Sequence, residues 1–125
     1  MAGVRRFEAS LAIGATLENL LTGTFLERLG PRPEMVSIYG VIPFFAAAAN
    51  NGTFTVEVRL GNVIVIDRAA VPQVGTAATD TSGPDRDKHL LTRAVGAPFD
   101  LVQIRLFNGS TVAVPYRFLV EATPL

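Results

Sequence analysis

Hydrophobic and polar side chains alternate along most of this chain. Residues 53–60, TFTVEVRL, place apolar side chains at every second position and separate them with Thr55, Glu57 and Arg59. A repeat of two residues is typical of a strand with one face on a core and the other toward solvent. The same repeat recurs in residues 100–107 and 111–121, and more briefly in residues 6–15 and 89–95. These segments are predicted to be half-buried strands.

Two further stretches, residues 34–45 and 62–66, are apolar on both faces, as expected for strands covered on both sides. Pro115 has no N–H to donate, so the strand that contains it should be bulged at that point or have an open edge there. Residues 16–29 carry leucines at roughly helical spacing, but Gly23 between two threonines favours extended backbone. The pattern therefore predicts about seven strands and little helix.

The triplet at residues 108–110, Asn-Gly-Ser, could be a glycan acceptor or a turn. Residues that pair across a hairpin share a face. A two-residue turn would place Arg105 opposite Val112, whereas a loop centred on Gly109 pairs Leu106 with Val112. No secretory signal precedes the triplet, and only such a signal would make the glycan relevant. We therefore predict a hairpin loop centred on Gly109.

Two more hairpins are predicted upstream. A three-residue loop at residues 50–52 would pair Phe44 with Val58 and give Gly52 the left-handed position of a turn with a bulge. Residues 61–62, Gly-Asn, fit a two-residue primed turn.

These features predict one all-β domain over residues 1–125, an antiparallel sandwich or barrel. The tight turns favour pairing between strands that follow one another in sequence, while jelly-roll connections remain an alternative. Residues 67–88 have little periodicity, and a connection of this length is usually a functional or mobile loop.

Charge and composition limit the classes of molecule that this chain is expected to bind. The chain has 11 basic and 11 acidic residues, no cysteine, and 49% hydrophobic residues. Zero net charge gives no long-range attraction for nucleic acid or an anionic membrane, and it favours association with protein. Disulfides and thiolate metal sites are excluded. The longest apolar run is shorter than a membrane span, so we expect neither a nucleic acid nor a membrane partner.

The candidates for chemistry are few. His89, the only histidine, follows Asp80, Asp85 and Asp87, which would suit a hard cation or an Asp-His pair. The alternative is a solvated loop, since two basic residues alternate with the acids and the ordered spacing of a calcium loop is missing. No serine lies in a nucleophile elbow. We therefore predict no catalytic, cofactor-binding or metal-binding residue, and no enzyme.

Contacts with other protein are expected from basic and apolar side chains outside the inward-facing sets. An aromatic among them could instead cover the second face of a sandwich or stand singly at the surface. The candidate interface residues are Arg5, Arg6, Tyr39, Phe45, Ile64, Ile66, Val74, Thr79 and Phe107.

Residues 11–40 (LAIGATLENLLTGTFLERLGPRPEMVSIYG) and 90–124 (LLTRAVGAPFDLVQIRLFNGSTVAVPYRFLVEATP) resemble the small all-β virion structural proteins of tailed phages, of the auxiliary or decoration type. The resemblance implies a homo-oligomeric subunit made in the host cytoplasm and located in the virion. There it would stabilise a capsid by contacts with the major capsid protein or other virion proteins. It assigns no role to any single residue.

Two other classes of function are open. A carbohydrate- or ligand-binding module predicts exposed aromatics around Tyr39 and Tyr116, although the chain has no tryptophan. An enzyme predicts His89 in a pocket beside a carboxylate.

Overall fold

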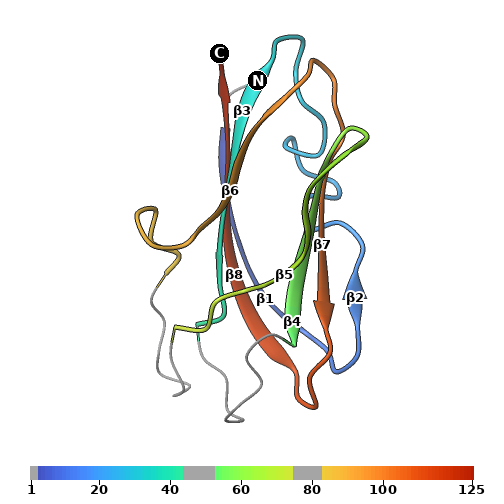
Figure 1. Ribbon diagram of the computed structural model, residues 1–125, viewed down its shortest axis with the longest axis vertical. Helices are drawn as coiled ribbons and strands as arrows, with labels where there is room; N and C mark the ends of the chain where they lie inside the picture. The colour runs from blue at the N-terminus through green and yellow to red at the C-terminus, as the bar shows by residue number, and fades with distance from the viewer. Residues whose placement is uncertain (1–2, 44–52, 75–82) are drawn as a thin grey trace.

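The computed structural model describes residues 3–43, 53–74 and 83–125, and these residues form eight β-strands and no helix (Figure 1). The all-β prediction is confirmed, with one strand more than expected. The strands are β1 (Gly3–Leu11), β2 (Thr16–Leu17), β3 (Glu34–Val41), β4 (Phe54–Leu60), β5 (Val63–Ala70), β6 (Leu90–Gly96), β7 (Val102–Asn108) and β8 (Val114–Pro124).

The strands form two four-stranded antiparallel sheets that face each other (Figure 1). The first sheet has the order β1-β8-β3-β6 and the second has the order β2-β7-β4-β5. Of the described strands, only β4 and β5 are both consecutive in sequence and paired. Every other connection between them crosses from one sheet to the other. This order is that of an eight-stranded jelly roll, the alternative that the sequence left open.

The predicted hairpin at residues 61–62 is confirmed. Leu60 pairs with Val63, and Gly61 has the positive φ of 58° that a primed turn requires.

The other two predicted hairpins are wrong. Leu106 pairs with Val56 and not with Val112, because β7 and β8 belong to different sheets. In the same way β3 and β4 belong to different sheets, and Val58 pairs with Ile66 and Ile104. Phe44 and the predicted loop at residues 50–52 lie outside the described residues. Two strands that pair side by side have matching inward-facing residues, but so do two strands that face each other across the core. The match therefore does not show that two strands pair.

Asn108 lies where a hairpin loop was expected, and its buried side chain forms a hydrogen-bonded junction between the end of β1 and the β7–β8 connection. It is 2% exposed. Its Nδ2 lies 2.9 Å from the carbonyl oxygen of Leu11, 3.1 Å from that of Ala12 and 2.9 Å from that of Val112. Its Oδ1 accepts the backbone N–H and the hydroxyl of Ser110, at 3.0 and 2.6 Å. The amide is fully engaged inside the fold, so the triplet is a structural turn.

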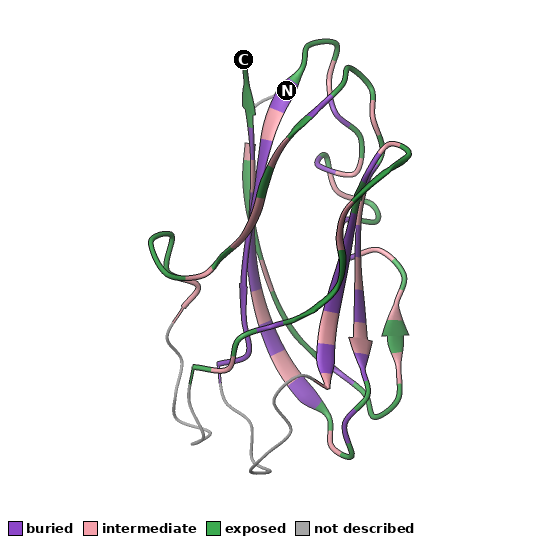
Figure 2. Ribbon diagram, in the orientation of Figure 1, coloured by how far each residue is buried: buried purple, intermediate pink, exposed green. Residues whose placement is uncertain are grey.

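The core lies between the two sheets, and most of its buried strand residues belong to the inner strands β3, β4, β7 and β8 (Figure 2). Leucines of residues 18–29 close one end of it. That segment forms turns and not the extended backbone predicted for it, because only Thr16–Leu17 is a strand. Asn19 anchors the segment, since its Oδ1 accepts the N–H of Ile104 at 3.1 Å. The fully or nearly buried leucines are Leu20, Leu21, Leu26 and Leu29.

β8 is an inner strand of the first sheet, and Pro115 lies at one of its ends. It pairs with Ser10 of β1, while the ladder to β3 extends only from Arg117 to Pro124. Pro115 therefore has an open position on the β3 side, one of the two arrangements that the sequence predicted.

β5 departs from prediction in two ways. It is an edge strand with a mostly exposed surface, so the expectation that residues 62–66 are covered on both sides is wrong. It also continues to Ala70, so Asp67–Ala70 are strand and not the start of a loop at residue 67. An apolar run that is open to a partner has the same sequence pattern as one that is buried.

Substitution of Asn108 tests the junction. Asn108→Ala should lower the free energy of unfolding by about 3 kcal/mol, since buried carbonyl and N–H groups lose their partner. Asn108→Asp should cost more, because a carboxylate would face three carbonyl oxygens. Urea denaturation measures both, with Thr111→Ala as an exposed control in the same turn. A loss no larger than that of the control would refute this role.

Candidate functional site

The acidic cluster near His89 is a closed turn. His89 Nδ1 accepts the backbone N–H of Asp85 at 2.8 Å, and Asp85 Oδ1 accepts the N–H of Asp87 at 2.8 Å. Asp80 lies outside the described residues. Among the residues that are described, no group of three His, Cys, Asp or Glu side chains could hold a metal ion. The geometry thus fits a structural turn better than a hard-cation site.

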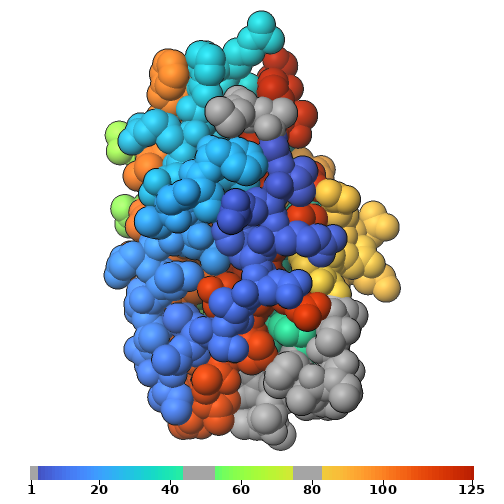
Figure 3. All heavy atoms as spheres, turned by 180° about the vertical axis from the view of Figure 1, so that it is seen from behind, coloured from blue at the N-terminus to red at the C-terminus, as the bar shows by residue number. Residues whose placement is uncertain are grey.

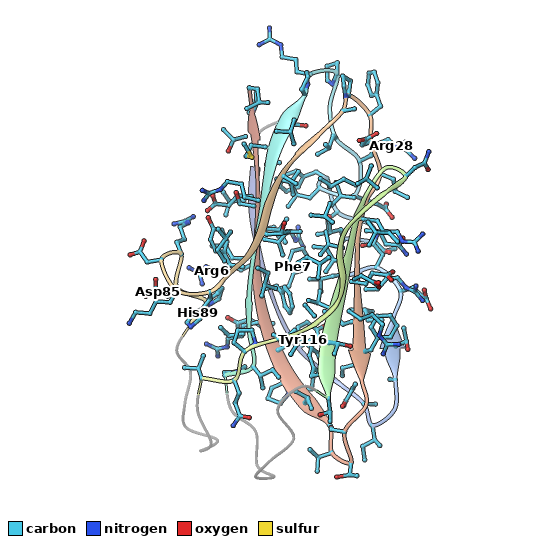
Figure 4. The ribbon with its side chains drawn as sticks, in the orientation of Figure 1. Arg6, Phe7, Arg28, Asp85, His89 and Tyr116 are labelled. Carbon is cyan, nitrogen blue, oxygen red and sulfur yellow. The ribbon has the colours of Figure 1, made fainter. Side chains whose placement is uncertain are left out.

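Residues 83–89 cover part of the outer face of the first sheet. Gly83 lies so close to Val41 that an added Cβ would come within 2.9 Å of Val41 Cγ2. Arg86 forms an ion pair with Glu121 of β8. Figure 4 places Asp85 and His89 beside this sheet, on the side away from the core. The end of the predicted long loop is therefore packed against the sandwich.

Tyr39 and Tyr116 are both buried, at 2% and 6% exposure. The Tyr39 hydroxyl accepts a hydrogen bond from Arg93 at 3.2 Å on the outer face of the first sheet. Tyr116 points between the sheets (Figure 4), with its ring 6.1 Å from that of Phe54, and burial raises the pKa of its phenol. Tyr39 is thus covered within the chain and offers little surface to a partner. The two tyrosines also cannot form the exposed patch expected of a ligand-binding module.

The remaining candidate interface residues do not gather at one place. Arg5 and Arg6 are exposed on β1, which lies open on the face in Figure 3. The others belong to the opposite side or to the second sheet: Ile64 is 48% exposed on β5, Ile66 is half-buried there, Val74 is 40% exposed, and Phe107 is half-buried on β7. Phe45 and Thr79 lie outside the described residues.

Phe99 is the more exposed of two aromatic residues, Phe25 and Phe99, that the sequence patterns missed among the described residues. It is 59% exposed and has a positive φ of 63°, which is unusual for a bulky side chain. Its N–H donates to the carbonyl oxygen of Gly30 at 3.0 Å, and its own carbonyl oxygen accepts from Arg28 Nη1 at 2.9 Å. Asp100 caps the turn through the N–H of Ala97 at 2.9 Å. The loop therefore holds an aromatic side chain outward on strained backbone.

The free edge of β5 is a second apolar feature. Val63 is 64% exposed and Ile64 is 48% exposed, and no charged residue occurs between Gly61 and Asp67. An edge strand presents unpaired N–H and C=O groups, and proteins usually protect it with charges or proline. This segment, residues 63–66, is thus suited to contact with another protein.

The outer face of the second sheet contains a pocket of about 360 Å³. Phe107, a candidate from the sequence, lies in its wall with the guanidinium of Arg68 4.0 Å above the ring centroid. Arg68 was not a candidate because it fell in the predicted loop. The lining residues are Gly14, Ala15, Thr16, Arg68, Phe107, Asn108 and Gly109.

No family model, no curated protein and no solved structure matches this chain. The described residues contain no helix long and apolar enough to cross a membrane.

The strain at Phe99 can be measured by comparing two truncations. Both Phe99→Ala and Phe99→Gly remove the ring, but only glycine adopts positive φ freely. The glycine variant should therefore be more stable than the alanine variant by about 1 kcal/mol in urea denaturation. Leu101, a neighbour without positive φ, is the control, and there alanine should be the more stable. If the alanine variant were the more stable one at both positions, the loop would not strain Phe99.

Proposed function

We propose that this chain is a non-enzymatic structural subunit of a virus particle that stabilises a phage capsid by protein–protein contacts. The observation that carries the proposal is the apolar, unprotected edge of β5 at residues 63–66. Such an edge would be a liability on a subunit that stays alone, whereas an assembling subunit can cover it.

Phe99 supports the same function from a second place. Aromatic anchors held rigidly at the surface are typical of the residues that dominate protein interfaces. Hydrogen bonds to residues 28–30 already restrict the backbone of Phe99. Less conformational entropy is therefore lost at this residue when a partner binds. The Phe99 loop lies beside the β4–β5 turn, because the N–H of Gly61 donates to the carbonyl oxygen of Leu101 at 2.8 Å, so the ring extends the contact surface that begins at the apolar edge.

The virus particle enters the proposal by analogy. Viral capsid domains are among the users of the jelly roll, which also serves lectins and cupins, so the strand order alone does not select between them. The resemblance of residues 11–40 and 90–124 to phage auxiliary proteins favours a role in a virus particle. The partners would be further copies of this chain and the major capsid protein or other virion proteins.

A charge on the apolar edge tests assembly. The wild-type chain should gain mass with concentration in sedimentation equilibrium, and Ile64→Lys should weaken that association by about tenfold or more, because the edge would then carry an unpaired charge. Ile13→Lys is the matched control, since Ile13 is also exposed, at 62%, but lies in the β1–β2 turn.

Two results together would contradict the proposed assembly. A wild-type chain that stays monomeric across about a hundredfold range of concentration, and that does not sediment with capsid shells, would refute the proposal.

A further inference from the structure

Arg68 has no counter-charge among the residues that the structure describes. On the outer face of the second sheet, Glu57 lies 3.2 Å from Arg105 and 3.5 Å from Arg59, and Glu18 lies 3.1 Å from Arg105. Arg68 forms no ion pair with any carboxylate of the described residues, including its neighbour Asp67.

A bulge in β5 sets the direction of Arg68. Val58 pairs with Ile66 and Val56 pairs with Ala69, so two residues of β5 lie opposite Glu57 alone. β5 also has an earlier irregularity at Val65, between the pairs Arg59–Ile64 and Val58–Ile66. From the Val58–Ile66 pair onward, a strand without the bulge opposite Glu57 would pair Arg68 with Val56, whose side chain is fully buried in the core. The extra residue turns the arginine away from the core, and bulges often re-aim side chains in this way beside functional sites.

The backbone of Arg68 is strained at the same position. Its φ is 53°, in the left-handed region that residues with a Cβ seldom occupy. Strain of this kind occurs preferentially at binding sites, where the surrounding structure maintains it. No charge pair between described residues explains why Arg68 is held there.

Phe107 orients the guanidinium. The Cζ of Arg68 lies 4.0 Å from the ring centroid, close enough for a cation–π contact, and the Cζ of Arg105 lies 5.1 Å from the same centroid. Contact with the ring limits the motion of the long side chain, while its N–H donors remain able to bind an oxygen ligand. Since Arg105 is already paired, Arg68 is the donor that is free.

The pocket beside this arginine suits a small acid. Its volume of about 360 Å³ lies in the range of small-molecule sites. Among the described residues that line it, Arg68 is the only charged one, and Thr16 is exposed there and adds a hydroxyl. Asn108 is occupied by its own hydrogen bonds. The lining therefore offers one positive charge, one hydroxyl and an aromatic wall.

We propose that the Arg68 pocket binds a carboxylate, whose two oxygens match the paired N–H donors of a guanidinium. The volume favours a small free acid about the size of a uronic-acid sugar. The same chemistry could come from an acidic side chain of a second copy of the chain. Neither source depends on the proposed capsid function.

NMR titration tests the site. Sodium glucuronate, at constant ionic strength, should shift the Arg68 side-chain Nε–H signal and the Thr16 and Gly109 amides in a saturable manner, whereas glucose should not. Arg68→Gln should weaken glucuronate binding by about tenfold or more, because the charge-assisted pair is lost. Arg59→Gln, on the same face, is the matched control and should bind as the wild type does.

A second measurement separates the two sources. If glucuronate does not bind, a carboxylate from a second copy requires that Arg68→Gln lowers self-association in sedimentation while Arg59→Gln leaves it unchanged. The proposal is overturned if glucose shifts the same signals equally, or if Arg68→Gln behaves as the wild type in both experiments. Unchanged backbone spectra away from the pocket would establish that the variants fold.

Discussion

The side chain of Asn108 joins two places where the chain passes from one sheet to the other. β1 ends at Leu11 before the chain crosses to β2, and β7 ends at Asn108 before it crosses to β8. The Asn108 amide bonds to the carbonyl groups at the first crossing and within the second. Its carbonyl oxygen also takes the N–H of Ser110, so one buried side chain must both donate and accept. Serine is too short and aspartate lacks the donor, which makes asparagine the residue suited to this position.

Backbone bonds extend this junction to a third connection. The N–H of Gly109 donates to the carbonyl oxygen of Thr53, just before β4 begins, and the N–H of Asn108 donates to that of Ala15. The strand order places β5 at the edge of the second sheet, where its apolar segment is exposed. The bulge opposite Glu57 then ends that apolar segment and places Arg68 on the outer face. One edge strand thus contributes to two separate surfaces, an apolar edge and a basic pocket.

Much of the fold could be predicted from the alternation of side chains, because burial on one face of a strand is a local property. Phe54 and Val56 are buried as expected, and so is Ile104 on the facing positions of β7. The pairing of strands could not be predicted in this way. The alternation of side chains on an inward face is the same whether the neighbouring strand lies beside it or across the core. For this reason the pattern pairs Leu106 with Val112, whereas its partner is Val56.

The candidate sites were harder to predict for a different reason. Tyr39 is covered through contacts with Arg93, distant in sequence, so its burial has no local signal. Phe99 and Arg68 owe their positions to left-handed backbone, and neither a turn dipeptide nor a repeat of two residues predicts that conformation at a residue with a side chain. Phe107 was chosen correctly as an outward aromatic, but its contact with Arg68 depends on the bulge.

β7 and β8 belong to different sheets that are joined through Asn108, and the rest of the strand order depends on this arrangement. Cross-strand amide and Hα contacts in an NMR spectrum of the labelled chain test it most directly, because paired strands bring these protons close together. We expect contacts of Phe118 with Phe7 and with Gly40, its partners in β1 and β3. A ladder that instead pairs β8 with β7, with Leu106 opposite Val112, would contradict it.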